Sequence, residues 1–384
     1  MEEGKLRVLF AVQGEGRGHM TQSLALATIL RNAGHEVVCA MLGTSSRREI
    51  PGFYYRKIDC PVQLYESPNF ITDKNGKGIR VLPSVVRSLR RSRAYFRNLA
   101  ILRKTIDHYE PDLIVNFYEP LMGILYLLHK PPVPMVTVAH QYLLHHPDFP
   151  FPDSKKLDQW MLKAFNHLTA SRSVLRLALS FSPLKQPKDK SLIILPPLLR
   201  QEVLEYPDVR KGDSYLVYLL NSGYSEEIMD WHRQHPDVVI DCFWDKSGAG
   251  EEFRPHPNLT FHRIDDEKFL RLMASCRAFI STAGFESVCE AMYFQKPVMM
   301  VPVAGHIEQL CNAMDARRVG AGIHSSVFDL NKFLHYLPGH KTNYTSYRNW
   351  VQVAPQKFMD VLSAFEPRKP QKARQPEEAG ALVS

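Results

Sequence analysis

A histidine stands at the start of a predicted helix, directly after three alternating glycines, in the stretch QGEGRGHM at residues 13–20. Because glycines lack side chains, Gly16 and Gly18 leave room for a substrate to approach the backbone. A neutral imidazole at this place can act as a general base, and the positive end of the helix disfavours its protonated form. His19 is therefore a candidate base, with simple capping of the helix as the alternative.

The same loop could instead bind the phosphates of a dinucleotide, because it joins an apolar strand to a helix. Two features disagree with that interpretation. The spacing is G-x-G-x-G rather than G-x-G-x-x-G, and the next strand, which ends CAMLG, lacks the terminal acid that would bind the ribose. We therefore expect a different kind of active site at this loop.

A second chemically suited stretch spans residues 279–313. It predicts a strand ending at Thr282, a turn of small residues at Ala283 and Gly284, and a helix whose first N–H groups can hold an anion. Glu290 lies one helical turn after Glu286, where it can accept hydrogen bonds from sugar hydroxyls. The stretch therefore predicts a site for an anionic sugar compound.

The elements around both stretches alternate between apolar strands and helices. We expect strands at 5–12, 35–42, 111–117, 131–140, 190–197, 214–220, 237–244, 259–264, 277–282 and 296–303, and helices at 20–34, 121–129, 221–236, 265–276, 284–295 and 307–320. This alternation predicts an α/β fold with parallel sheets in two Rossmann-like domains. Since ligands bind beyond the carboxyl ends of such strands, the two domains would face a central cleft.

A segment rich in proline and charge, LPPLLRQEVLEYPDVRKGD, marks the expected domain boundary. We expect a first domain at 1–205, which binds the acceptor, and a second at 206–345, which binds the donor. A helix at about 345–366 is expected to pack back on the first domain. The tail at 367–384 lacks apolar periodicity and is predicted to be disordered.

The stretch 279–313 resembles the nucleotide-sugar signature of GT-B glycosyltransferases. It is similar to plant and animal UDP-sugar glycosyltransferases and to the peptidoglycan lipid-intermediate N-acetylglucosaminyltransferases. The resemblance implies the GT-B fold and sugar transfer from a nucleotide diphosphate sugar, UDP-linked by analogy, to an acceptor hydroxyl. The matching residues are Gly284, Phe285, Ser287, Glu290, Pro297, Pro302, Glu308, Gln309, Asn312 and Ala313.

The resemblance also implies roles on the donor side. The turn at 283–287 would hold the diphosphate, with Thr282 in the place of the usual histidine. Glu290 would bind the ribose, and Glu308 and Gln309 the transferred sugar. Further implied donor contacts are Arg200 in the hinge sequence PPLLR, Ser222 and Gly223 in a phosphate loop, and Ile264 beside the base.

On the acceptor side, the resemblance places His19 on the family's motif histidine. Glu119 or Asn116 could orient it, and capping of the following helix is an equal alternative for Glu119. His140 and Gln141 end another strand and are expected to contact the acceptor. Four histidines, at 129, 140, 145 and 146, match no metal-binding spacing, so we expect no metal site.

The sequence departs from the family pattern at two places. Glu286 stands where plant enzymes often have asparagine, and a carboxylate beside a diphosphate is unfavourable unless it points away. We therefore expect Glu286 to face solvent or the acceptor. Gln22 or Ser23 replaces the proline that usually follows the motif histidine.

The formal net charge of +8 is concentrated in the segment Arg80–Lys104, which also follows helical spacing. A solvated helix face is one interpretation, and contact with anionic lipid headgroups at a membrane is the other. No nucleic-acid motif accompanies the charge, so no nucleic-acid partner is expected. The scattered cysteines and the start MEEGKLRVLF predict a cytoplasmic protein with reduced thiols, with the inner face of the membrane as an alternative place.

The sequence thus predicts a metal-independent, inverting glycosyltransferase with a nucleotide sugar as co-substrate and no other cofactor. The missing Asp-x-Asp pair is the reason for expecting no required divalent cation. The acceptor is unknown, and a lipid-linked compound is one option. Two alternatives remain: a nucleotide-sugar epimerase or hydrolase on the same fold, and a nucleotide-sugar-binding protein without catalysis.

Overall fold

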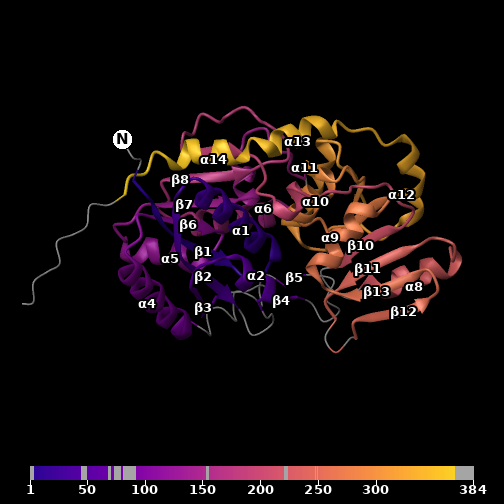
Figure 1. Ribbon diagram of the computed structural model, residues 1–384, viewed down its shortest axis with the longest axis horizontal. Helices are drawn as coiled ribbons and strands as arrows, with labels where there is room; N and C mark the ends of the chain where they lie inside the picture. The colour runs from indigo at the N-terminus through magenta and orange to yellow at the C-terminus, as the bar shows by residue number, and fades with distance from the viewer. Residues whose placement is uncertain are drawn as a thin grey trace, which may run out of the picture.

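The computed structural model describes residues 4–44, 50–67, 71–72, 79–80, 92–152, 155–219, 224–246, 248 and 250–367 of the 384-residue chain. Within these residues the chain forms two large sheets and a short two-stranded one. Figure 1 shows the two large sheets side by side, the first in indigo and purple and the second in orange, with helices packed around each. The predicted α/β class with two parallel sheets is confirmed.

The first sheet has the strand order β3-β2-β1-β6-β7-β8-β9, and all its strands are parallel. Its inner strand β1 is a continuous apolar run, fully buried from Val8 to Val12, because helices cover both faces. The strands are β1 (Arg7–Gln13), β2 (Glu36–Thr44), β3 (Val62–Glu66), β6 (Leu113–Phe117), β7 (Met135–Ala139), β8 (Leu175–Leu179) and β9 (Leu192–Leu195).

Helices connect the strands of the first sheet, as right-handed parallel crossovers require. They are α1 (Arg17–Asn32), α2 (Gly52–Lys57), α4 (Ser92–Tyr109), α5 (Pro120–His129), the 3-10 helix η1 (His140–His145) and α6 (Lys156–Thr169). The two-stranded sheet pairs β4 (Ile71–Thr72) with β5 (Ile79–Arg80) in antiparallel fashion. Residues 81–91 of the basic segment Arg80–Lys104 lie outside the described residues, and the membrane contact of the segment stays a prediction.

The second sheet has the order β12-β13-β11-β10-β14-β15-β16, and only the edge strand β12 is antiparallel. Its strands are β10 (Tyr215–Leu219), β11 (Ile240–Trp244), β12 (Glu252–His256), β13 (Leu259–Arg263), β14 (Ala278–Ser281), β15 (Val298–Met300) and β16 (Gly322–His324). Its helices are α8 (Ser225–Gln234), α9 (Asp266–Ser275), α10 (Phe285–Tyr293), α11 (Ile307–Arg318), α12 (Leu330–Tyr336) and the 3-10 helix η3 (Leu337–Gly339).

Two segments connect the halves. The short helix α7 (Gln201–Leu204) lies in the link between β9 and β10. At the other end of the chain, α13 (Tyr344–Gln352) packs on α10, and α14 (Ala354–Leu362) contacts α1 and β9 of the first half, as the yellow ribbon in Figure 1 shows. We expected one helix over about 345–366, but the helix is interrupted at Val353. Pro355, in the first turn of α14, has no N–H with which to continue the hydrogen bonding of α13.

The halves also share apolar contacts beside the central cleft. Phe181, just after β8, packs on Phe285 at the start of α10, with ring centroids 4.6 Å apart. The largest hydrophobic cluster includes both rings and continues through both halves. The start of α10 is thereby held against the first half, which determines where the chemical groups of the cleft meet.

Candidate active site

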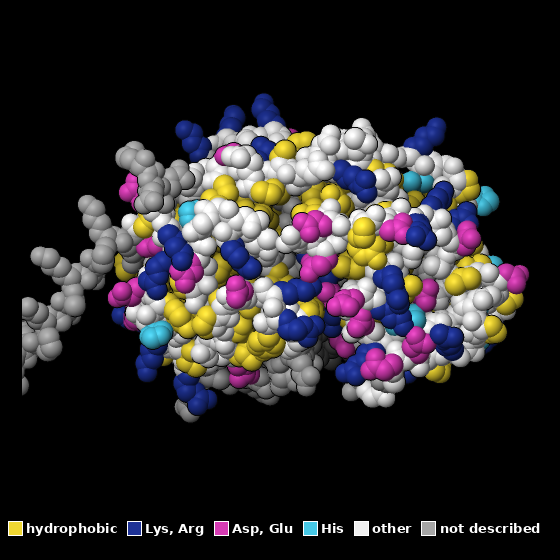
Figure 2. Space-filling model, viewed as in Figure 1, with side chains coloured by type: hydrophobic (Ala, Val, Ile, Leu, Met, Phe, Trp, Pro, Cys, Tyr) yellow, Lys and Arg dark blue, Asp and Glu magenta, His cyan; other side chains and the backbone are white. Residues whose placement is uncertain are grey.

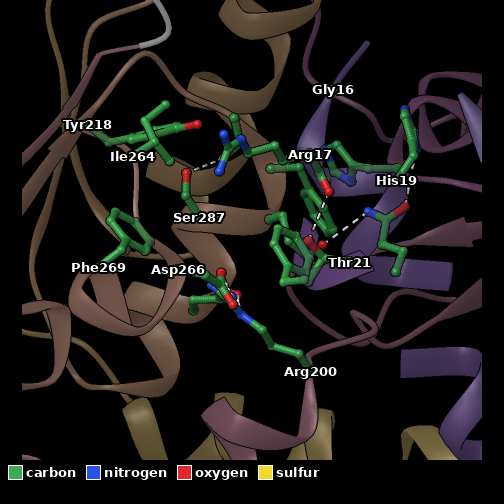
Figure 3. A pocket seen from close by; sticks show the side chains of 18 of the residues that line it. Gly16, Arg17, His19, Thr21, Arg200, Tyr218, Ile264, Asp266, Phe269 and Ser287 are labelled. Atoms are coloured by element: carbon green, nitrogen blue, oxygen red, sulfur yellow. Dashed lines mark hydrogen bonds and ion pairs between the residues drawn. The ribbon is translucent and has the colours of Figure 1, made fainter. Parts of the chain in front are cut away.

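A cleft of about 210 Å³ lies between the two halves, at the carboxyl ends of the central strands. Figure 3 shows Gly16, Arg17, His19 and Thr21 on one wall and Tyr218, Ile264, Phe269 and Ser287 on the other. Twelve of the residues predicted from the sequence line it: Gly16, Gly18, His19, His140, Gln141, Arg200, Ile264, Gly284, Phe285, Ser287, Glu290 and Glu308.

The glycines before α1 serve two different purposes. A Cβ on Gly14 would lie 2.7 Å from the carbonyl oxygen of Gly43, so this glycine is required for packing between the loop and β2. A Cβ on Gly16 would meet nothing within 4 Å. Gly16 is the N-cap of α1 and makes no side-chain cap, so the N–H groups of the first turn are left without a side-chain acceptor from it.

His19 lies in the first turn of α1 and is only 8% exposed. Its Nδ1 lies 3.2 Å from Oε1 of Gln22, and its ring stacks on Tyr118 with centroids 5.5 Å apart. Burial lowers the pKa of His19 to about 4, although the hydrogen bond with Gln22 acts in the opposite direction. The imidazole is therefore neutral at pH 7, as a general base must be.

The expectation that Glu119 orients the His19 imidazole is wrong, because the partner of His19 Nδ1 is Gln22 and the carboxylate of Glu119 is bonded elsewhere. Its carboxylate caps α5 by accepting from the N–H of Leu121 at 3.0 Å and accepts from Ser67 Oγ at 2.6 Å. Asn116 is likewise structural, because its amide donates to the carbonyls of Glu119 and Thr169. Neither residue lines the cleft; the alternative of helix capping describes Glu119 correctly.

His140 and Gln141 cross from the first half to the second. The ring of His140 stacks on Phe285 with centroids 4.0 Å apart, and its Nδ1 donates to the carbonyl of Leu179 at 2.7 Å. The Gln141 amide donates to Oε1 of Glu308 at 2.9 Å. Both residues line the cleft, where an acceptor could reach them.

The second wall is the start of α10. Gly284 is the N-cap of α10 and makes no side-chain cap, so the first N–H groups of a helix whose start lines the cleft have no side-chain acceptor from it. Ala283 has a φ of +60°, a left-handed conformation that costs a non-glycine residue roughly 1–2 kcal/mol. Thr282 and Ala283 are buried behind the cleft and do not line it, while Ser287 does.

Glu290 and Arg200 both line the cleft and are bound to each other. Arg200 Nε donates to Glu290 Oε1 at 2.6 Å and Nη2 to Oε2 at 3.1 Å, and Nη1 is paired with Asp266. Burial raises the pKa of Glu290, and the guanidinium opposes that shift. Figure 3 shows Arg200 reaching from the hinge to Asp266. The sequence predicted both residues at the site but not their pairing.

The remaining donor-side predictions fall into three groups. Glu308 lines the cleft, and burial raises the pKa of its carboxyl to about 7. The Gln309 side chain turns away, because its Oε1 accepts from the N–H of Val303 at 2.8 Å. Ile264 lines the cleft, whereas Ser222 and Gly223 lie outside the described residues.

The comparisons with known proteins agree with this geometry. The sequence model of glycosyl transferase family 1 matches residues 6–338. The chain belongs to glycosyl transferase family 1. An uncharacterized glycosyltransferase of Methanosarcina acetivorans is 23% identical over 341 residues, which are 83% of this chain and 85% of the archaeal protein. The predicted activity class, sugar transfer, is confirmed.

Solved structures confirm the GT-B fold of this glycosyltransferase. The glycotransferase of kitacinnamycin matches with a TM-score of 0.64 and 14% identity, over 94% of this chain and 100% of its own. Arabidopsis thaliana UGT89C1, complexed with UDP-L-rhamnose, matches with a TM-score of 0.59 and 14% identity, over 94% and 99% of the two chains. At such identities the likeness concerns the fold.

The structure adds residues to the glycosyltransferase site that were not predicted as contacts: Arg17, Thr21, Gln22, Phe53, Tyr218, Asp265, Asp266, Phe269 and Glu286. Arg17 and Thr21 share the helix face that begins at the glycine loop, so helical spacing could have indicated them. Glu286, expected to face solvent or the acceptor, is 8% exposed and accepts from Gln22 Nε2 at 3.1 Å, on the acceptor side.

In the described part of the glycosyltransferase, no group of three or more His, Cys, Asp and Glu residues is placed to hold a metal ion. No helix in the described ranges has both the length and the apolar character needed to cross a bilayer.

Proposed function

We propose that this glycosyltransferase takes its sugar from a UDP-linked donor and transfers it to an acceptor hydroxyl in the cleft. The observation that carries the proposal is the pairing of a buried neutral imidazole, His19, with the uncapped start of α10 across the same cleft. A helix start of this kind suits a diphosphate. The fold shared with UGT89C1, whose structure holds UDP-L-rhamnose, supports the choice of UDP.

In the proposed reaction, Nε2 of His19 removes the proton from the acceptor hydroxyl. The oxygen then forms a bond to the anomeric carbon while the bond from that carbon to the diphosphate oxygen breaks. The leaving nucleoside diphosphate gains negative charge, which the N–H groups of α10 and the Ser287 hydroxyl stabilise. A single displacement inverts the anomeric configuration, and no divalent cation is needed in this scheme.

Donor binding would replace the ion pair between Arg200 and Glu290. The ribose hydroxyls would donate to Glu290 and the diphosphate would accept from Arg200, so each buried charge keeps a charge-assisted hydrogen bond. This exchange matters because a buried charge that loses its partner is costly. If Arg200 turns to the diphosphate, Asp266 still has a cationic partner, since Lys57 Nζ lies 3.4 Å from its carboxylate.

The test is to incubate the purified protein with UDP-sugars and a panel of hydroxylated acceptors, and to measure UDP release and the anomeric configuration of the product. We expect acceptor-dependent release, an inverted product and unchanged activity in EDTA. Release of free sugar or appearance of an epimer from the donor alone would favour the hydrolase or epimerase. Retention of configuration, or loss of activity in EDTA, would contradict the mechanism.

A further inference from the structure

Three buried side chains form a continuous hydrogen-bonded chain across the cleft. His19 and Gln22 lie on α1 of the first domain, and Glu286 lies on α10 of the second. His19 Nδ1 is 3.2 Å from Gln22 Oε1, and Gln22 Nε2 is 3.1 Å from Glu286 Oε2. Their exposed fractions are 8%, 3% and 8%, so water does not compete strongly for these contacts.

The order of donors and acceptors in this chain follows from the end at Glu286. A carboxylate only accepts hydrogen bonds, so the amide of Gln22 must present its N–H₂ to Glu286. Its carbonyl oxygen then faces His19 and can only accept, so the proton of the neutral imidazole is on Nδ1. The lone pair is left on Nε2, the nitrogen that a general base would use.

The order holds for the ionised carboxylate of Glu286 and for a carboxyl group that is protonated on Oε1. Burial raises the pKa of Glu286 well above its usual range, and the carboxylate of Glu290 adds to the shift. Oε1 of Glu286 has no hydrogen-bond partner among the described residues. A proton on Oε1 leaves Oε2 as the acceptor for Gln22. The charged or titratable groups that interact with Glu286 are Glu290, Arg200, Cys289 and Tyr347.

We propose that Gln22 and Glu286 are positioning residues that hold His19 in the tautomer protonated on Nδ1, with Nε2 free to accept the acceptor's proton. The inference rests on the proposed role of His19 as the base. The hydrogen bonds from His19 through Gln22 to Glu286 join α1 to α10. The tautomer of His19 is therefore fixed only while the two domains are in contact. The donor-binding domain thereby supplies the last residue that the base requires.

The close approach of the two helices supports this coupling. Gly18 lies opposite Glu286, and a Cβ on Gly18 would be 3.4 Å from the Cβ of Glu286. The absence of a side chain at Gly18 therefore lets α10 bring the Glu286 carboxyl within reach of Gln22. Glycine at this position serves the contact between the walls.

The test compares three variants by kcat, KM and pH profile in the transfer assay. Gln22→Met keeps the volume but makes no hydrogen bonds, so kcat should fall ~10²-fold with little change in donor KM. Glu286→Gln offers an amide in place of the carboxyl and no longer determines the orientation of Gln22, so its loss of kcat should be smaller. Gln356→Met is the matched control, because Gln356 bonds a carboxylate on the exposed face of α14.

The variant Gln22→Glu should shift the pH profile of activity, which a merely structural role of Gln22 would not do. It places a carboxylate on Nδ1 of His19, with Glu286 protonated and donating to it. The nearby negative charge should move the acidic limb of the kcat/KM profile up by about one pH unit or more. An unmoved acidic limb, or wild-type kcat in Gln22→Met, would overturn the inference about Gln22; wild-type kcat in Glu286→Gln would overturn it for Glu286.

His19→Ala separates this inference from the proposed function. If His19→Ala keeps full activity, His19 is not the base and the proposed mechanism fails. If His19→Ala is inactive while the Gln22 and Glu286 variants behave like the wild type, only the positioning chain fails. Melting temperatures within about 3 °C of the wild type would show that each variant is folded.

Discussion

The two walls of the cleft share one backbone feature, a helix that begins after a strand and a glycine N-cap. Helices α1 and α10 each follow a buried parallel strand, and each begins after a glycine N-cap without a side-chain cap. The side chains in their first turns differ. α1 carries His19, while α10 carries Ser287 and Glu286. In the proposed mechanism, one uncapped helix start presents the base, and the other presents the site for the diphosphate.

The difference shows how one electrostatic feature can serve two purposes. The positive end of a helix favours negative charge and disfavours positive charge. At α10 it suits the diphosphate of the proposed donor. At α1 it works with burial to keep His19 uncharged, while Glu286 turns from the anion site toward the opposite wall.

The strongest way to break the comparison is to remove the base. His19→Ala should lower kcat on the order of 10³-fold, because the acceptor proton loses its recipient, while UDP binding by calorimetry stays unchanged.

The pH dependence of activity tests the same imidazole, because its proton-accepting form persists down to the pKa of about 4. In a Glu308→Gln variant, which lacks the cleft carboxyl with a pKa of about 7, the kcat/KM profile should therefore be flat from pH 8 to about pH 5 and fall below it; a midpoint near 6.5 would contradict this.

The next prediction concerns Glu290, on the wall formed by α10, where the donor is proposed to bind. Glu290→Gln should weaken UDP binding by roughly 10- to 100-fold, because the ribose hydroxyls lose a charged acceptor. The loss should shrink with the 2′-deoxyribose or 3′-deoxyribose form of the ligand and vanish with the 2′,3′-dideoxyribose form, and wild-type protein should bind each of these less tightly. Equal losses for all ligands would mean that Glu290 acts only through Arg200.

Substituting alanine for each N-cap glycine, Gly16 before α1 and Gly284 before α10, compares the ligand-binding roles of the two walls. A Cβ on Gly284 would have only Ser287 Oγ, at 3.6 Å, as a neighbour, and one on Gly16 would have none. Both variants should therefore melt within about 2 °C of the wild type. Gly284→Ala should weaken UDP binding several-fold, and Gly16→Ala should raise only the acceptor KM. Gly14→Ala, which would clash with Gly43, should unfold at a clearly lower temperature.

The smallest effect on activity is expected at Glu119, which lies outside the cleft. Burial raises the pKa of Glu119 to about 7, although hydrogen bonds from Ser67 and Leu121 oppose the shift. Its contribution to stability is present below pH 4.5 and is lost as the pH rises through 7. Glu119→Gln should thus cost about 1–3 kcal/mol more at pH 5 than at pH 8, with kcat within twofold; denaturant unfolding at both pH values measures this.

Apolar periodicity predicted most of the sheet strands, because a strand buried on both faces must be apolar throughout. It could not indicate β12, whose sequence EFRPH is largely exposed at an antiparallel edge. Three further strands of the two large sheets were missed: β3, which is partly polar and exposed; β8, whose start polar residues interrupt; and β16, which has only three residues. The C-terminal helix was predicted as one element, although Pro355 was visible in the sequence and could have indicated the break.

At the site, short motifs predicted His19, Gly284, Ser287 and Glu290, because loop spacing and helix starts are local properties. They could not decide the partners of these side chains. Glu119 lies one residue after Tyr118, whose ring stacks on His19, yet its carboxylate points to Ser67. Sequence proximity to a strand end therefore does not determine which side chain faces the cleft.

The sequence by itself determined the order of most strands and helices along the chain, the glycines that precede two helix starts, and the family. These depend on local backbone hydrogen bonding and hydrophobic period, which neighbouring residues control. Only the tertiary structure decided that Gln22 joins His19 to Glu286, 264 positions away from Gln22. Contacts of that kind depend on how two domains pack against each other, and no local spacing specifies that packing.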